Sequence, residues 1–296
     1  ERGVHAEHYH AGLDAGSRAR VQEQWMADEV KVICATVAFG MGINKHDVRF
    51  VVHHSLPKSL EGYSQETGRA GRDNEPACCY LFYTYGDKSK IDAMIVKSEG
   101  DETSKATHRQ QLLQMVSYAE NQFECRRKLM LRYFQEDFDP SQCHKTCDNC
   151  KASGGDGCGA ERVDRAALAC KALALLEQTR AKLTLGMTVD ALKGSSSQTL
   201  RNKRATELPA FGSAKECTKS DLERVLKLML EKGYVDEYYE KLGDWGGVTG
   251  YLRTGPRADA LTRGEPLHML VAKAGAKAGG GKGGGRDTSA LPVRGG

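Results

Sequence analysis

The sequence predicts a parallel α/β domain that is followed by a helical, Cys-rich module and a winged-helix domain. Three observations predict this order. Residues 1–86 alternate short, weakly charged β-rich runs with helical segments, four cysteines between 125 and 150 have the spacing of metal ligands, and residues 162–270 combine amphipathic helices with a hairpin. Buried strands that are separated by helices favour a parallel sheet covered on both faces.

The N-terminal region contains three candidate strands and two candidate helices. The β-rich runs are 30–36, 47–56 and 77–84, and helices are expected over 16–26 and 59–70. Ligands of an open α/β sheet bind beyond the carboxyl ends of its strands. Thr36 ends the first run. We therefore expect Thr36, the loop "FGMGIN" (39–44) and "YHAGL" (9–13) to converge on one edge with the arginines of 63–73.

The segment "YSQETGRAGRD" (63–73) places Arg69 and Arg72 three residues apart among glycines. The planar guanidinium of arginine presents several N–H donors that suit phosphate oxygens, and Gly68 allows a close approach. Alternatively, the segment is an ordinary helix C-terminus that ends at a glycine, where the macrodipole favours cations. Taken alone, these residues leave both interpretations open.

Four clustered cysteines follow a largely helical region. Helices are expected from Gly86 onward and over 104–134, with a break near Asn121, and the cysteine pattern is Cys125-x17-Cys143-x3-Cys147-x2-Cys150. Four thiolates at this spacing can enclose a tetrahedral Zn²⁺ and leave no open position, so the metal would be structural. The alternative is a chance cluster of buried thiols, and His144 and Cys158 lie near enough in sequence to replace a ligand.

A winged-helix domain is expected over 162–270, after a Gly-rich linker at 152–161. Its clearest helix is 220–235, which a capping box of Ser220 and Glu223 would start and Gly233 would end. The pattern of residues 234–255 predicts a hairpin with a Gly-rich tip. An aromatic ring there, Trp245 or Tyr239, could stack on the last base pair of a duplex.

The segment "GSSSQTLRNKR" (194–204) is a candidate contact for a nucleic-acid backbone. It offers hydroxyls and backbone N–H groups at a helix start, an arrangement that suits phosphate. The contacts expected here are Ser195, Ser196, Arg201 and Lys203. For each of these residues the alternative is a solvated helix face.

Composition is that of an ordinary globular protein. Of 296 residues, 40% are hydrophobic and 28% charged, and no apolar run approaches the ~20 residues of a membrane span. Ten cysteines in a chain this long indicate a reducing compartment rather than a secreted disulfide scaffold. The chain has no signal-peptide pattern and no initiator Met, so we expect Glu1 to be a cut end.

The net charge of +4 lies in the C-terminal tail, where five basic residues from Lys273 onward oppose one acid, Asp287. The preceding chain is therefore neutral overall, and any site for nucleic acid must be a local patch. Residues 271–296 are rich in glycine and lysine, and we expect a disordered tail there.

Several segments resemble the RecQ family of superfamily 2 DNA helicases. "ATVAFGMGINKHDVRF" (35–50) resembles motif V and "YSQETGRAGRD" motif VI, "HYHAGLDAGSRARVQEQW" (8–25) is similar to the family's sequence after motif IV, and "CRRKLMLRYFQEDF" with "CHKTCDNC" resembles its zinc module. The resemblance runs from residue 3 to 150 and more loosely to about 270. It implies a RecA-like second helicase domain over 1–86, a helical zinc-binding module over 87–151 and a winged helix over 162–270.

The resemblance also implies roles for individual residues. In these motors ATP and Mg²⁺ lie between two RecA-like domains, and the second domain supplies the arginines. By position, Arg72 is similar to the arginine finger on the γ-phosphate and Arg69 to its supporting partner. Gln65, Asn44 and Gly68 match positions near the nucleotide, and Thr36 matches a DNA backbone contact of motif V. The implied zinc ligands are Cys125, Cys143, Cys147 and Cys150.

One part of the family's pattern is missing. The sequence contains neither G-x-x-x-x-G-K-[ST] nor D-E-x-H, and "GGGKGGG" in the tail has no Ser/Thr. We expect the C-terminal half of a 3′–5′ helicase that unwinds forked or partly single-stranded DNA in repair, recombination and replication. Such a protein works in the nucleus if eukaryotic and in the cytoplasm otherwise. The alternative is a DNA-binding protein that lost its motor, although it would have no use for Arg69 and Arg72.

Overall fold

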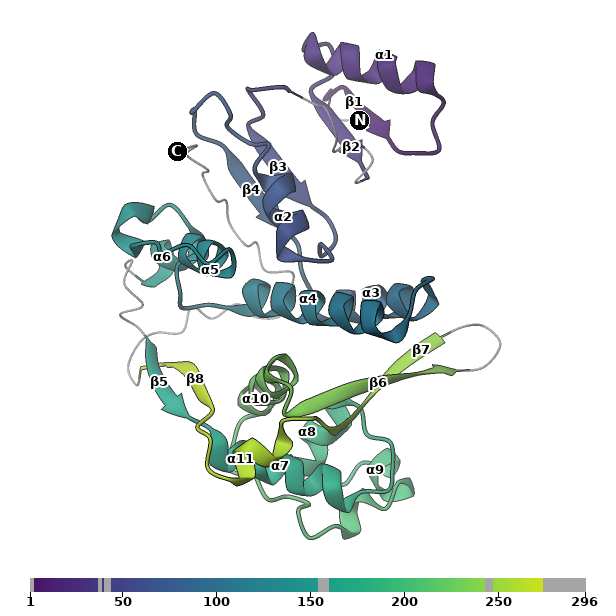
Figure 1. Ribbon diagram of the computed structural model, residues 1–296, viewed down its shortest axis with the longest axis vertical. Coiled ribbons are helices and arrows are strands. Elements are labelled where there is room, and N and C mark those ends of the chain that lie inside the picture. The colour runs from purple at the N-terminus through teal and green to yellow at the C-terminus, as the bar shows by residue number, and fades with distance from the viewer. Residues whose placement is uncertain (1–2, 37–38, 40–43, 154–159, 243–246, 274–296) are drawn as a thin grey trace. The chain divides into compact units, whose positions relative to one another are not determined.

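The computed structural model describes residues 3–36, 39, 44–153, 160–242 and 247–273, and Figure 1 shows its elements. Among these residues the chain forms two compact units. The first contains residues 3–51 and 64–79, and the second contains 52–63 and 80–273. No helix of the described part is long and apolar enough to cross a membrane.

The N-terminal elements are a parallel strand pair joined by a helix. β1 (Ala6–Tyr9) pairs with β2 (Val32–Ala35) in the register Ala6 opposite Val32. α1 (Ala15–Met26) connects them and begins at Asp14, whose carboxylate accepts the Ser17 N–H at 2.9 Å. The predicted helix and the first predicted strand are both present, and the parallel pairing confirms the expected direction of the strands.

A second strand pair carries the arginine segment. β3 (Phe50–His53) lies beside β4 (Cys78–Leu81), with α2 (Leu60–Thr67) between them in sequence. The N–H of Cys78 donates to Arg49 O, and the N–H of Phe82 donates to His53 O, each at 2.9 Å. The bonds advance together along both strands, as they do in a parallel pair.

The predicted single sheet, covered on both faces, is not what the described strands form. They make two separate pairs, and β3 alternates in burial because successive side chains point to opposite faces. Val51 packs on buried Ala70, Ala77 and Cys79. Phe50 and Val52, on the other face, are 46% and 47% exposed. The expectation of fully buried strands is therefore wrong for β3.

A helical module follows in the second unit. It consists of α3 (Tyr85–Lys97), α4 (Glu102–Glu120), α5 (Arg126–Tyr133), the short 3₁₀ helix η2 (Pro140–Cys143) and α6 (Asp148–Ser153). Asp101 caps α4 by accepting the Ser104 N–H at 2.7 Å. Leu112 and Met115 on α4 are completely buried and pack with Ile91 of α3. The predicted break near Asn121 is confirmed.

The last domain has a helical core flanked by two antiparallel strand pairs (Figure 1). Its helices are α7 (Ala166–Gln178), α8 (Leu185–Lys193), α9 (Gln198–Asn202), η3 (Ala205–Glu207), α10 (Lys219–Lys232) and α11 (Ala258–Thr262). β6 (Val235–Leu242) and β7 (Gly247–Thr254) form the predicted hairpin. β5 (Ala160–Asp164) and β8 (His268–Ala272), far apart in sequence, pair without having been predicted.

The predicted cap of α10 is wrong by two residues. Thr218 starts the helix, and its hydroxyl accepts the Asp221 N–H at 3.0 Å. Both Thr218 and Ser220 are hydroxyl residues with an acid three residues further on, so both fit the capping-box pattern. Starting the helix at Thr218 adds one backbone hydrogen bond, from Leu222 N–H to Thr218 O at 3.1 Å. The predicted end at Gly233 is confirmed by its left-handed φ of 76°.

Candidate functional site

The arginine segment is a tight turn after α2 that lies against the chain just before β3. Gly71 has a left-handed φ of 69°, a conformation that glycine adopts without strain. Its N–H donates to Val48 O at 3.0 Å, and the Asp73 N–H donates to His46 O at 3.2 Å. Two backbone bonds therefore hold the turn that carries Arg72.

The two arginines differ in exposure. Arg69 is half-buried and Arg72 is exposed, with its Nε donating to Gly68 O at 3.3 Å. The carboxylate of Asp73 forms an ion pair with Arg49, and the hydrogen bond from Arg49 holds the pKa of Asp73 below its usual value. Asp73 is therefore paired with an arginine from the chain just before β3.

The other predicted nucleotide and DNA contacts of this unit lie at its surface. Gln65 on α2, Gly68 and Asn44 are exposed. Thr36 directly follows β2 and is also exposed, and its N–H donates to Tyr9 O at 3.1 Å. Most of "FGMGIN" is outside the described residues, so the convergence of this loop with the arginines stays a prediction.

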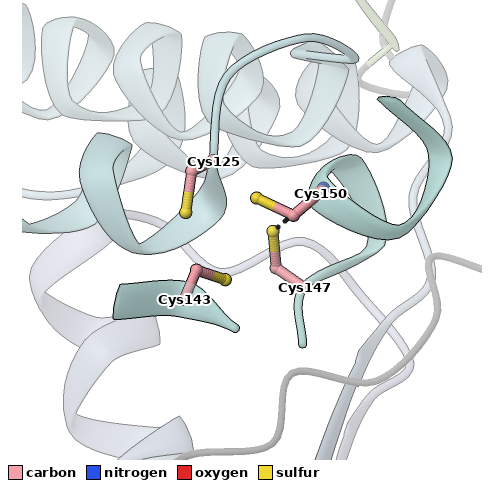
Figure 2. A group of neighbouring side chains, drawn as sticks. All are labelled: Cys125, Cys143, Cys147 and Cys150. Carbon is pink, nitrogen blue, oxygen red and sulfur yellow. Dashed lines mark hydrogen bonds between the residues drawn. The ribbon is translucent and has the colours of Figure 1, made fainter. Parts of the chain in front are cut away.

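The four cysteines of the predicted metal site come together (Figure 2). Their sulfur atoms all lie within 4.8 Å of one another, and all four residues are buried. A tetrahedral ion with Zn–S bonds of ~2.3 Å separates its sulfurs by about 3.8 Å. The donor set therefore fits Zn²⁺ in both chemistry and size, and it leaves no position for a substrate.

Three local structures place the four cysteines. Cys125 precedes α5, Cys143 ends η2, and Cys147 and Cys150 bracket the start of α6. The Cys150 N–H donates to Cys147 Sγ at 3.3 Å, as the dashed line in Figure 2 shows. This bond turns the backbone around the sulfur and brings the second thiol to the same side.

Hydrogen bonds among the thiols and burial set their protonation. The bond from the Cys125 thiol, followed by the backbone N–H groups of Arg126 and Cys150, lowers the pKa of Cys147 to about 5. The same thiol–thiolate bond raises the pKa of Cys125, and burial raises that of Cys150 to about 12. Zinc binding therefore releases protons, and its affinity rises with pH.

The two competing ligands have different outcomes. His144 is exposed, adopts a left-handed φ of 50° and is not in the cluster. Cys158 is outside the described residues. The cluster is the one group of at least three metal-binding side chains within the described ranges.

Residues that the sequence analysis missed support the cluster. Arg127 donates to Thr146 Oγ1 at 2.8 Å and to Cys143 Sγ at 3.7 Å. Buried Asn149 donates to Glu124 O at 2.7 Å, so α6 is tied to the chain before Cys125. In the sequence, the only sign of these supporting residues is that they are polar and lie close to a cysteine. Exposed surface residues share both properties, so the sequence does not identify the supporting residues.

A buried ion pair joins the two halves of the cluster. Arg126, beside Cys125, donates from Nε and Nη2 to the two carboxylate oxygens of Asp148, each at 2.9 Å. Its Nη1 donates to Tyr118 O. The side chains of Arg126 and Asp148 are 7% and 17% exposed, so this paired geometry is shielded from water.

Arg126→Met is expected to lower the free energy of unfolding by about 3–5 kcal/mol, because it leaves Asp148 as a shielded charge without its cation. Arg132→Met is the matched control, since Arg132 pairs with Glu124 at 58% exposure and such a pair contributes about 0–1 kcal/mol. Urea unfolding of the zinc-loaded protein, followed by circular dichroism, checks this. Equal midpoints for the two variants would contradict it.

The predicted DNA contacts of the last domain lie around α9. Ser195 is half-buried, Ser196 and Arg201 are exposed, and the Lys203 ammonium lies 6.0 Å from the centre of the Tyr251 ring. The hydroxyl that caps α9 belongs to Ser197, which accepts the Leu200 N–H. Ser197 was not among the predicted contacts, although it is the hydroxyl residue directly before the helix.

The two aromatic candidates of the hairpin have separate outcomes. Trp245 is outside the described residues. Tyr239 is not available for base stacking in this structure, because its hydroxyl donates to Glu237 Oε2 at 2.7 Å and accepts from Lys88 Nζ at 3.1 Å. Its side chain therefore faces α3, and the suggested contact with a base pair is wrong for Tyr239.

Three family models match consecutive parts of the chain. The helicase conserved C-terminal domain matches residues 1–74, the RecQ zinc-binding domain matches 85–151 and the RQC domain matches 159–277. The cysteine cluster lies in the second match, the arginine turn in the first, and α9 with the hairpin in the third.

Curated relatives align over most of the chain. ATP-dependent helicase SGS1 of Saccharomyces cerevisiae is 40% identical over 265 residues, 89% of this chain and 18% of the relative. ATP-dependent DNA helicase hus2/rqh1 of Schizosaccharomyces pombe is 41% identical over 253 residues, 86% of this chain and 19% of the relative. ATP-dependent DNA helicase Q1 of Pongo abelii is 38% identical over 260 residues, 88% of this chain and 37% of the relative.

The chain thus spans less than two fifths of the length of these relatives. Among solved structures, the Mycobacterium smegmatis helicase Lhr bound to ssDNA and AMP-PNP aligns over 87% of this chain and 24% of its own, with a TM-score of 0.26 and 16% identity. The three family matches and the relatives of about 40% identity place this chain in the RecQ family of DNA helicases, as a region with the C-terminal helicase, zinc-binding and RQC domains.

Proposed function

We propose that this chain is the C-terminal part of an ATP-dependent DNA helicase that translocates 3′ to 5′ and separates the strands of forked or partly single-stranded DNA. The observation that carries the proposal is the presence, in one chain, of the arginine turn and the helicase, zinc-binding and RQC matches. A DNA-binding protein without a motor has no use for a turn whose two arginines suit a phosphate.

The arginine turn supplies half of an ATP site in this proposal. Arg72, exposed on a turn that two backbone bonds hold, reaches the γ-phosphate as an arginine finger, and half-buried Arg69 supports it. Gln65, Gly68 and Asn44 lie near the nucleotide. ATP and Mg²⁺ are shared with a P-loop domain. The bound nucleotide supplies the phosphoryl group, and the arginines stabilise the charge that develops on it.

The rest of the chain binds DNA and holds the fold. Zn²⁺ bound by Cys125, Cys143, Cys147 and Cys150 keeps α5, η2 and α6 together and takes no part in chemistry. The proposed contacts with the DNA backbone are Thr36, Ser195, Ser196, Arg201 and Lys203, and the proposed contact with the bases is Trp245. We propose that the protein acts in the nucleus, in DNA repair, recombination and replication. The domain limits proposed for it are 1–86, 87–151 and 162–270, with a linker at 152–161 and a tail at 271–296.

A chimera tests the proposed function. Residues 1–273 replace the aligned region of the yeast relative SGS1, which is 40% identical over 265 residues. We expect DNA-stimulated ATP hydrolysis and ATP-dependent separation of a forked duplex. The isolated chain, which has no P-loop, should bind DNA but not hydrolyse ATP. A chimera that is folded, zinc-loaded and DNA-bound without ATP hydrolysis would favour the alternative, a DNA-binding protein without a motor.

A further inference from the structure

A buried ammonium group links the helical module to the hairpin of the last domain, and both lie in the second compact unit. Lys88, on α3, has a side chain that is 3% exposed. Its Nζ lies 2.6 Å from Asp92 Oδ2, one turn further along the helix, and 2.5 Å from Glu237 Oε2 on β6. Glu237 is separated from Lys88 by 149 residues in sequence. The contact therefore fixes one domain against another.

The register of the hairpin and a glycine on β7 place the carboxylate of Glu237 next to Lys88. In the antiparallel register Tyr239 lies opposite Gly250, and Glu237 opposite buried Leu252, so these residues share one face of the hairpin. A Cβ atom at Gly250 would lie only 2.8 Å from Glu237 Cδ. The missing side chain at Gly250 is what lets Glu237 lie across β7 toward Lys88.

Tyr239 and α4 complete the cluster. The Tyr239 hydroxyl accepts from Lys88 Nζ at 3.1 Å and donates to Glu237 Oε2 at 2.7 Å. The guanidinium of Arg109, on α4, lies 5.2 Å from the centre of the Tyr239 ring. Lys88 thus meets two carboxylates, Asp92 and Glu237, while Arg109 packs on the Tyr239 ring and pairs with Glu102 at 3.7 Å.

The ammonium of Lys88 keeps its charge in spite of burial, whereas burial raises the pKa of Asp92. Burial opposes the ammonium of Lys88, but the carboxylates of Glu237 and Asp92 outweigh it and raise the pKa of Lys88. A buried ion pair adds little net stability compared with an apolar replacement, but it is strongly disfavoured when its partners move apart. The pair therefore favours the relative geometry of the hairpin and the helices in which Lys88 meets both carboxylates.

We propose that Lys88 is a positioning residue, which holds the β6–β7 hairpin in one orientation on α3 and α4. The role of Lys88 in orienting the hairpin does not depend on the proposed function. Only the expected effect on DNA rests on that function. If the hairpin meets the duplex end, a hairpin free to swing binds DNA but opens the end less efficiently.

Hydrogen exchange of the zinc-loaded 296-residue chain tests the orientation without DNA. The principal variant is the charge-free Lys88→Met/Asp92→Asn/Glu237→Gln, which leaves no unpaired buried charge. Gly250→Ala keeps every charge and displaces Glu237 from the hairpin side. Lys90→Met is the matched control, because Lys90 lies on the same helix at 74% exposure. Binding of a forked duplex, with a fluorescent base analogue in its last pair, is measured in parallel.

In the charge-free variant and in Gly250→Ala, we expect the amides of 235–241 and 248–254 to exchange at least about tenfold faster, as in a segment that opens more often. Exchange in α7 and α8, zinc content and duplex affinity should stay as in the parent and in Lys90→Met, while the fluorescence signal of strand opening falls. Unchanged hairpin exchange in both variants would overturn the inference. A parent chain that binds no forked DNA would count against the proposed function, while the exchange result would still decide the role of Lys88.

Discussion

Cys147→Ser is expected to weaken zinc binding by more than about 100-fold, since changes to the outer partners of a metal site alone weaken binding by roughly 10–100-fold. Cys147 is completely buried, its sulfur lies with three others within 4.8 Å, and it accepts the Cys150 N–H at 3.3 Å. The hydrogen bond from the Cys125 thiol also lowers the pKa of Cys147 to about 5, so the substitution removes a thiolate ligand.

Loss of the metal is expected to release the segment around η2 and α6. Binding free energy is folding free energy in small zinc modules, and the described residues 136–142 include none that is buried. Element analysis of purified protein should fall from one zinc per chain to almost none. Limited proteolysis should cut between 136 and 150, while the first compact unit stays resistant.

Two control variants test the ligand set. His144→Ala changes an exposed residue beside Cys143, and Cys158→Ser removes the other nearby candidate. Both should keep one zinc per chain and the parent's protease resistance. Full zinc occupancy in Cys147→Ser, or zinc loss in Cys158→Ser, would show that the four ligands are wrongly assigned.

Arg72→Ala in the chimera is expected to lower kcat for ATP hydrolysis by ~10³-fold, because an arginine finger stabilises charge that exists only in the transition state. DNA affinity should be nearly unchanged. The turn itself should persist, since the bonds from Gly71 N–H to Val48 O and from Asp73 N–H to His46 O are made by the backbone.

Arg20→Ala is the matched control for this prediction. Arg20 is an exposed arginine on α1 of the same unit, outside the arginine turn. Steady-state ATP hydrolysis with saturating DNA and fluorescence anisotropy of labelled DNA separate turnover from binding. An Arg72→Ala variant that loses DNA binding but keeps normal turnover would assign Arg72 to the DNA path instead of the nucleotide.

Most helices were predictable because their signals are local. Amphipathic spacing and a terminal glycine predicted α10, and Gly233 ends it with a left-handed φ of 76°. The cap was wrong because Thr218 and Ser220 present the same hydroxyl-to-acid spacing, and only the backbone bond to Thr218 separates them. The β5–β8 pair was missed since its strands lie at opposite ends of the domain.

The sequence by itself determined the order of the three domains, the four clustered cysteines and the arginine turn. Each of these is marked by residues that lie close together in the sequence, and the local backbone alone brings such residues near one another. The tertiary structure alone decided which polar residues are buried and what they meet. Arg126 faces Asp148 across 22 residues and Lys88 faces Glu237 across 149, and Tyr239 turns toward α3 instead of a base. Such pairs depend on how distant elements pack, and a charged residue in sequence shows nothing of whether water or a carboxylate will surround it.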